Sequence, residues 1–215
     1  MGAGVPSVSI YRTAFIPQTR AAFAKLGATP PGAAAAQAAY AHAFQVLNEA
    51  GFDQPRYGSS CFSRQAYRYG LNDHRRHVLA AKPMVGLGMG AYGTTPGYTY
   101  ANLRDRAAYQ GAIAQGRLPV MVAQPLAPAG RPHKWAVETW KLAFLPRDAY
   151  AEVFGEPVEA RFGDALAVLQ ELGQIVRVGD EYRLTREGAA HPDAVADLFV
   201  SPAARAWTGQ LAQGA

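Results

Sequence analysis

The sequence predicts an α/β fold that becomes mostly helical toward its C-terminal end. Two observations support this prediction. In the first half, short β-branched runs alternate with helical patterns, and the connections are too long for hairpins and typical of parallel α/β structure. In the second half, helical patterns dominate and one hairpin interrupts them.

The composition is that of a globular protein. The 215 residues are 49% apolar and 11% aromatic, which is enough to bury a core. The net charge is +5, but the arginines are scattered, so the charge indicates an anionic ligand or nucleic acid only weakly. The sequence shows no targeting segment and no apolar run of about 18 residues, the length that a membrane span needs. We therefore expect a cytoplasmic protein with no membrane partner.

The first half has one helix with a particularly clear pattern. Over residues 33–50, Tyr40, Phe44 and Leu47 share one face, and Gly51 supplies the C-terminal cap. The other expected elements are a strand over 5–11, a short helix over 20–25, a strand with its exit loop over 52–62, a strand over 83–87, an extended segment over 98–100 and a helix over 101–116.

The second half begins with a proline-rich crossing segment at 118–132. Helices are expected over 134–145 and 162–172. Two strands then meet at Gly179-Asp180, and Thr185 opens the next helix. This order resembles a winged-helix module. Such modules bind nucleic acid in regulators, but in enzymes they often only pack or cover, so we do not expect a nucleic-acid partner.

The stretch "GMGAYG" at 88–93 is spelled like a dinucleotide-binding fingerprint. The context excludes that interpretation, because "TTPG" follows it and no helix starts where the pyrophosphate would need one. The glycines therefore need another reason. Their spacing leaves one face of the segment without side chains, which suits either a flat ligand or close packing against the protein itself.

Five motifs in order resemble radical S-adenosylmethionine proteins of the oxygen-independent coproporphyrinogen oxidase type. They are "VSIYRTAFIPQT" at 8–19, "YGSSCFSR" at 57–64, "YRYGLN" at 67–72, "MVGLGMGAYGTT" at 84–95 and "YRLTREGAAHPDAVADLF" at 182–199. The resemblance covers essentially the whole chain but only the C-terminal half of such a protein. It implies the C-terminal portion of a partial (β/α) TIM-type barrel over 1–118 and a mostly helical, winged-helix-like domain over 119–215.

The resemblance also implies cofactors that this chain cannot hold by itself. The family binds a [4Fe–4S] cluster through a C-x-x-x-C-x-x-C loop, and thiolates are the required ligands. The one cysteine, Cys61, lies outside any such loop and is expected to be a small buried residue. We therefore expect no metal ligands here and no activity of the chain alone. An N-terminal radical S-adenosylmethionine segment, or a separate chain, would have to supply the cysteines.

Several positions match binding positions of the resembled family, although no catalytic residue can be named. Arg64 and Arg68 are candidates to pair with the carboxylates of a tetrapyrrole-like substrate. The positions expected to line the S-adenosylmethionine site are Ala14, Phe62, Ser63, Gly86, Gly88, Gly90 and Tyr92.

The motifs leave the activity open. The H-N-x-x-Y stretch of haem chaperones is replaced here by residues 69–73, "YGLND", which speaks against haem transfer. A decarboxylating porphyrinogen oxidase, a haem-utilisation enzyme, and a methyltransferase or cyclopropane-forming enzyme of secondary metabolism all remain. The alternative from another class is a binding module without catalysis, with a free sheet edge at 5–11 available for self-pairing.

Overall fold

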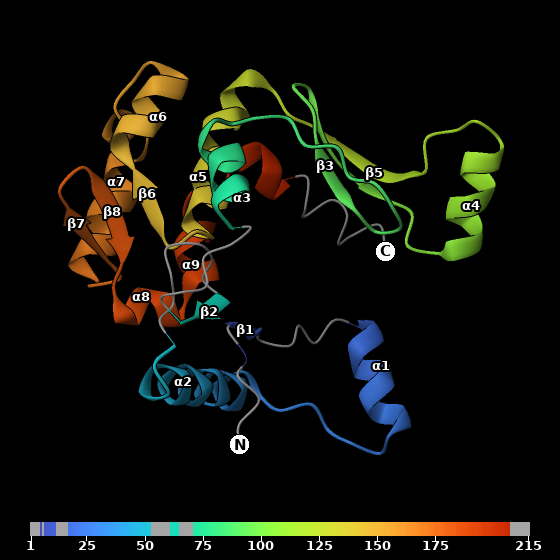
Figure 1. The fold of residues 1–215 in the computed structure, drawn as a ribbon, viewed down its shortest axis with the longest axis horizontal. Coiled ribbons are helices and arrows are strands. Elements are labelled where there is room, and N and C mark those ends of the chain that lie inside the picture. The colour runs from blue at the N-terminus through green and yellow to red at the C-terminus, as the bar shows by residue number, and fades with distance from the viewer. Residues whose placement is uncertain (1–4, 6, 12–16, 53–60, 65–70, 207–215) are drawn as a thin grey trace.

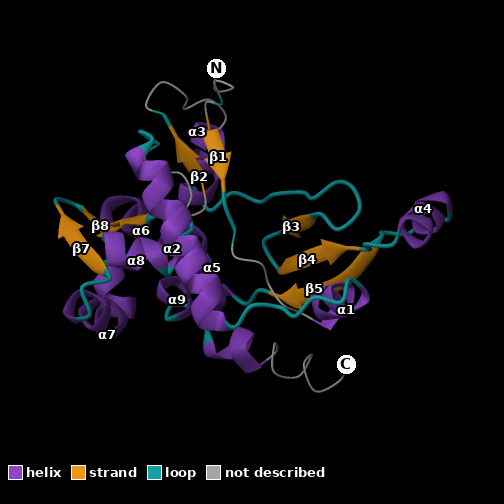
Figure 2. Cartoon of the chain, turned by 90° about the horizontal axis from the view of Figure 1, so that it is seen from below, coloured by secondary structure: helices purple, strands orange, loops and turns teal. Residues whose placement is uncertain are grey.

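The computed structural model describes residues 5, 7–11, 17–52, 61–64 and 71–206. Two parts dominate the view in Figure 1. One is a helical C-terminal region, residues 131–199. The other is an arm, residues 84–125, which carries a small sheet and projects from that region, with helix α4 at its far end (Figures 1 and 2).

The elements before the arm form a small antiparallel pair and three helices. They are β1 (Ser7–Ser9), α1 (Pro17–Lys25), α2 (Ala33–Glu49), β2 (Cys61–Ser63) and α3 (Leu71–Leu79). Val8 of β1 pairs with Phe62 of β2. Phe62 is fully buried, and its ring meets Phe44 of α2 edge-on at 5.4 Å between centroids. Ala189 joins the same cluster, so these elements pack against the C-terminal region.

The arm contains β3 (Tyr92–Thr94), β4 (Tyr98–Asn102), α4 (Arg106–Ala114) and β5 (Val120–Pro125). Its sheet has the order β3-β4-β5, and both pairs are antiparallel. Helix α4 starts where it does because the Asp105 side chain accepts a hydrogen bond from the Ala108 amide at 2.8 Å, an N-terminal cap.

The C-terminal region wraps helices around a second antiparallel sheet, of order β6-β8-β7. Its core contains Trp135, Trp140, Tyr150, Phe162 and Phe199. A short 3₁₀ turn, η1 (Pro128–Gly130), leads into the region from the arm. The elements of the region are α5 (Arg131–Trp140), β6 (Phe144–Pro146), α6 (Arg147–Phe154), α7 (Val158–Glu171), β7 (Ile175–Val178), β8 (Glu181–Leu184), α8 (Arg186–Ala190) and α9 (Pro192–Asp197).

The structure confirms a mixed helix-and-sheet fold and several of the expected elements. Helix α2 has Tyr40 and Phe44 on its buried face. The hairpin of β7 and β8 turns at Gly179-Asp180, and the Thr185 hydroxyl accepts from the Gly188 amide at 3.1 Å as the cap of α8. None of the helices that the structure describes is long and apolar enough to cross a membrane.

The parallel arrangement expected for the first half is wrong. Every strand pair within the described residues is antiparallel. The expected strand over 83–87 is reduced to one bridge, between Met84 and Thr94. The segment at 118–132 instead contains a strand, β5, which the sequence analysis missed because prolines surround it.

Two expected helices are shorter than their patterns. The helix expected over 101–116 begins only at Arg106, because Asn102 still belongs to β4. The helix expected over 134–145 ends at Trp140, since Ala143 adopts a left-handed conformation with φ of 67°. Leu145, expected on that helix, is buried in β6 instead.

Candidate functional site

The glycine-rich motif forms a closed loop, residues 84–94, which we call the glycine loop. Two backbone hydrogen bonds between Met84 and Thr94, of 2.8 and 2.7 Å, close its base. Its inner side rests on β4 and α4. The Gly86 amide donates to Tyr100 Oη at 3.0 Å, and the Gly88 amide donates to Tyr109 Oη at 3.1 Å.

Asn102 forms hydrogen bonds with two backbone carbonyls of the same loop. Its side chain is buried, and its Nδ2 donates to the carbonyl oxygens of Gly86 at 3.1 Å and Gly88 at 3.0 Å. One buried amide therefore satisfies two backbone acceptors that would be costly to leave unpaired. The sequence analysis did not single out Asn102, Tyr100 or Tyr109, because nothing in the sequence marks them as neighbours of the glycines.

At Gly86 and Gly93, close packing against the protein itself explains the glycine. A Cβ on Gly86 would lie 2.3 Å from the Tyr92 carbonyl oxygen, and one on Gly93 would lie 2.2 Å from the Tyr100 ring. Gly88 and Gly90 have φ of 103° and 65°, a conformation that side-chain-bearing residues rarely adopt.

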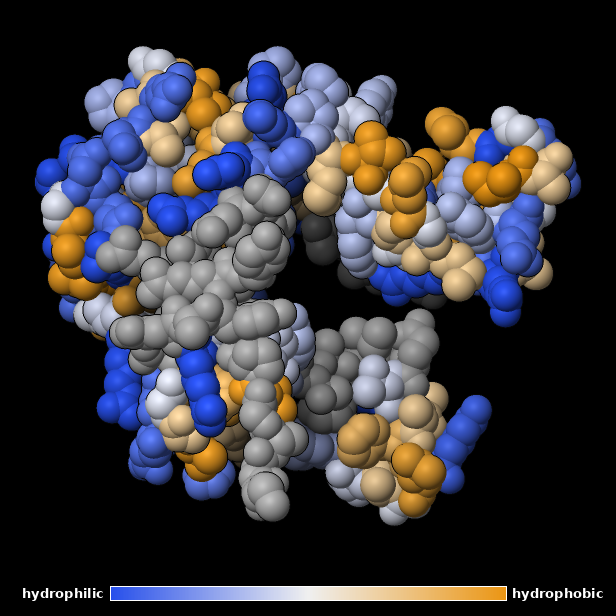
Figure 3. Space-filling model, viewed as in Figure 1, coloured by the Kyte–Doolittle hydropathy of each residue, from blue (hydrophilic) through white to orange (hydrophobic). Residues whose placement is uncertain are grey.

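The outer side of the glycine loop is apolar and exposed. Val85, Leu87 and Met89 alternate with the glycines and are 69%, 85% and 50% exposed. Tyr92 is also exposed, and its hydroxyl accepts from Arg104 Nη2 at 3.2 Å. On the face shown in Figure 3, apolar surface lies over the arm, and the C-terminal region is largely hydrophilic with smaller apolar patches. Of the described side chains expected to line the cofactor site, that of Tyr92 is exposed and those of Phe62 and Ser63 are buried.

The other expected site residues lie elsewhere. Phe62 and Ser63 are buried in β2, which Figures 1 and 2 place apart from β3 and the glycine loop. Arg64 is exposed, with its guanidinium carbon 4.8 Å from the centroid of the Phe52 ring. Ala14 and Arg68 lie outside the described residues. The structure thus brings the glycines and Tyr92 together but holds Phe62 and Ser63 on different elements.

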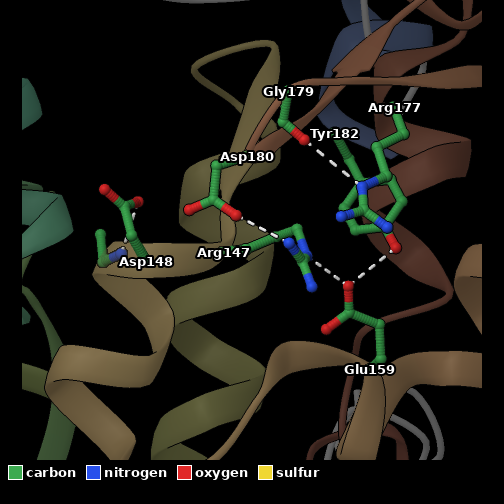
Figure 4. Close-up of polar contacts among 8 residues, drawn as sticks. Arg147, Asp148, Glu159, Arg177, Gly179, Asp180 and Tyr182 are labelled. Carbon is green, nitrogen blue, oxygen red and sulfur yellow. Dashed lines mark hydrogen bonds and ion pairs between the residues drawn. The ribbon is translucent and has the colours of Figure 1, made fainter.

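A polar cluster outside the expected site fixes the hairpin of β7 and β8 (Figure 4). The Arg147 guanidinium donates to Asp180 Oδ1 at 2.7 Å and also to Glu159 Oε1, which accepts from Tyr182 Oη at 3.0 Å. Burial raises the pKa of Glu159, but the hydrogen bonds from Arg147 and Tyr182 outweigh it, so its pKa lies below the ordinary value. Burial, and then the bond to Glu159, raise the pKa of Tyr182. Through Arg147, the cluster connects the turn of the hairpin to the start of α6. Its role is therefore structural.

A [4Fe–4S] cluster does not fit the residues of this chain. Its sequence contains one cysteine. Within the part of the chain that the structure describes, no three histidine, cysteine or acidic side chains gather closely enough to hold a metal ion. Three thiolates from elsewhere would be needed.

No family model and no curated protein matches the sequence. Among solved structures, the chain is similar to coproporphyrinogen III oxidase (HemN) from Escherichia coli, which is described as a radical SAM enzyme, with a TM-score of 0.67 and 14% sequence identity. The match covers 91% of this chain and 48% of the other. The chain therefore has a HemN-like fold and spans about half the length of that structure.

Proposed function

We propose that this chain is the C-terminal half of a radical S-adenosylmethionine enzyme that acts on a tetrapyrrole, of the coproporphyrinogen oxidase-like or haem-utilisation type. The observation that carries the proposal is the match to HemN, which covers nearly all of this chain but only 48% of that protein. The chain lacks cluster ligands, so it is inactive alone and depends on an N-terminal segment or a separate chain.

Each half of the chain has a proposed part in that enzyme. The winged-helix-like domain, expected over 119–215, is proposed to begin only at residue 131, because β5 (Val120–Pro125) pairs with β4 in the arm. The element order α5, β6, α6, α7, β7, β8 supports this, as does the sheet order β6-β8-β7. Residues 1–118 complete a partial barrel with the missing segment. Among the described strands of this part, every pair is antiparallel, so the proposed barrel needs parallel pairs beyond those that the structure describes.

The proposed roles of the side chains follow their exposure. Tyr92, oriented by Arg104, contacts S-adenosylmethionine, and the glycine loop brings it there. Phe62 and Ser63 are buried, so they support the site through β2. Arg64 and Arg68 pair with substrate carboxylates, since a guanidinium and a carboxylate match in a fork. The same arrangement of this chain and an N-terminal segment would also suit a methyltransferase or a cyclopropane-forming enzyme. Such an enzyme would differ from the tetrapyrrole enzyme in its substrate.

The test is anaerobic reconstitution with iron and sulfide, followed by iron and sulfide analysis, electron paramagnetic resonance and an assay of S-adenosylmethionine cleavage. It is run on this chain alone and on the chain mixed with a segment, encoded beside it, that carries three cysteines. We expect a cluster and cleavage only in the mixture. The matched control is Cys61→Ala, which should leave both unchanged.

Two results would contradict the proposal. If Cys61→Ala abolishes the cluster of the mixture, this chain contributes a ligand and the division of roles is wrong. If no preparation holds a cluster, the radical chemistry is lost and the chain is a binding module. The exposed apolar side of the glycine loop is the observation that favours this second function.

A further inference from the structure

A cavity of about 140 Å³ lies where α3, the base of the glycine loop and α5 meet. Its lining is mainly apolar and includes Val78, Met84, Leu126 and Trp135. The Trp135 indole is buried and fixed, because its Nε1 donates to the Leu79 carbonyl at 3.0 Å. The cavity therefore has a preformed wall against which an apolar group could pack.

One residue of the wall is in a strained conformation. Ala81 ends α3 with φ of 49°, in the left-handed region where glycine is usual. Two backbone bonds hold this turn, from the Ala81 amide to Val78 at 2.9 Å and from the Lys82 amide to His77 at 3.1 Å. Ala81 and Lys82 both line the cavity. Such strain often accompanies a functional surface.

The rim carries surplus positive charge. Lys82, Arg131 and Lys134 line it, against the single carboxylate of Glu138. That carboxylate already lies 3.0 Å from Lys141 Nζ and 3.8 Å from Lys134 Nζ. Lys82 and Arg131 are exposed, and within the described residues their side chains make no hydrogen bond or ion pair. Two cations at the mouth of an apolar cavity are thus available to a ligand.

We propose that this cavity binds an amphipathic carboxylate, with its apolar body against Val78, Met84 and Trp135 and its carboxylate between Lys82 and Arg131. A guanidinium pairs bidentately with a carboxylate, and an ammonium adds a second charge-assisted bond. The volume suits a medium-chain aliphatic acid or a small aromatic acid rather than a macrocycle. The site uses only residues of this chain, so it does not depend on the proposed radical chemistry.

The test measures binding of octanoate to the full chain by titration calorimetry, with octanol and octylammonium as probes of the same apolar body. We expect octanoate to bind at least about tenfold more tightly than either. The double variant Lys82→Gln/Arg131→Gln should lose about tenfold or more in octanoate affinity without a change in melting temperature. Arg106→Gln removes an exposed charge from α4 and is the matched control, with no expected loss.

A variant with the opposite sign sharpens the test. Glu138→Gln removes the one carboxylate of the rim and should strengthen octanoate binding while weakening that of octylammonium. The proposal is overturned if the three probes bind equally, if octanoate does not bind, or if Arg106→Gln weakens it as much as the double variant does. Should the double variant not fold, the probe comparison on the unaltered chain decides.

Discussion

The arm and the C-terminal region are stabilised in different ways. The C-terminal region is built on aromatic packing: Phe199 is fully buried, and its ring centroid lies 5.5 Å from that of Trp140 and 5.1 Å from that of Phe162. The arm depends on hydrogen bonds within it: Asn102 donates to carbonyls of the glycine loop, and Tyr100 and Tyr109 accept from its amides, while the apolar side chains of the loop face solvent. We infer that the C-terminal region is the stable unit and that the arm opens first.

The difference also distinguishes two tryptophans of the C-terminal region, Trp135 and Trp140. Trp135 Nε1 donates to Leu79, whereas Trp140 Nε1 is buried without a partner among the described residues. A core with one unpaired donor tolerates it because the indole contributes a large apolar surface there. Specific polar geometry therefore matters in the arm and where α5 meets α3, whereas apolar volume matters around Trp140.

The largest effect should come from the core. Phe199→Ala should lower the free energy of unfolding by about 3–5 kcal/mol, because it leaves a cavity between Trp140 and Phe162. Denaturant unfolding of the full chain measures it. Leu87→Ala in the arm is the control, since that side chain is 85% exposed and should cost less than about 0.5 kcal/mol. Equal losses would show that the two regions do not differ as inferred.

Replacing a glycine in each region should destabilise the region that contains it. Gly188→Ala would put a Cβ 1.9 Å from the Gln174 carbonyl oxygen, and Gly86→Ala one 2.3 Å from that of Tyr92. Each should cost about 1–3 kcal/mol. We expect amide hydrogen exchange to rise throughout the C-terminal region for Gly188→Ala and only in the arm for Gly86→Ala. The control Gly163→Ala, inside α7 with nothing within 4 Å, should stabilise by up to about 1 kcal/mol. Global loss from Gly86→Ala would refute an independent arm.

Asn102 provides the matching test of polar geometry. Asn102→Ala leaves the Gly86 and Gly88 carbonyls without their donor and should destabilise the arm by about 1–3 kcal/mol. Exchange of the glycine-loop amides should rise while exchange in α7 stays the same. Asn102→Asp, which keeps the shape but removes the donor, should be at least as harmful. If Asn102→Asp behaves like the unaltered chain, shape rather than hydrogen bonding sets the loop.

The smallest effect concerns pH and the cluster at Arg147. The pKa of Glu159 is lower in the folded chain than the ordinary 4.5, so its contribution to stability is present above that value and is lost as the pH falls through the folded pKa. Glu159→Gln should remove about 0–1 kcal/mol at neutral pH and flatten the loss in acid. Melting temperatures at stepped pH measure both. A matched loss from Glu152→Gln, an exposed residue of α6, would show that the cluster adds nothing.

The sequence predicted the elements whose signals are local. Helix α2 follows from the spacing of Tyr40 and Phe44, and the cap of α8 follows from Thr185. The start of α4 also has a local signal, because Asp105 is a capping residue. The sequence analysis nevertheless placed the start at residue 101. The end of α5 has no such local signal, because the left-handed Ala143 leads into β6, which is defined by its pairing with the distant strand β8.

The strand directions and the site depended on non-local contacts. Long connections suggested parallel strands, but β3 and β4 form an antiparallel hairpin through the short turn at 95–97, and β5 returns from α4 to pair with β4. The glycine spacing left two explanations open, and only the positions of Tyr100, Asn102 and Tyr109 favoured one of them. Whether the expected binding residues meet a cofactor stays a prediction.

The inward bonding of the glycine loop has a thermodynamic consequence. The amides and carbonyls of Gly86 and Gly88 are already used, and the exposed side chains between and beside them, Val85, Leu87 and Met89, carry no hydrogen-bond donor. A partner that covers the outer side of the glycine loop would be stabilised by the burial of apolar surface rather than by new hydrogen bonds. Its association would carry a negative heat-capacity change and would weaken on cooling, so a complex assembled in the cold room could be missed.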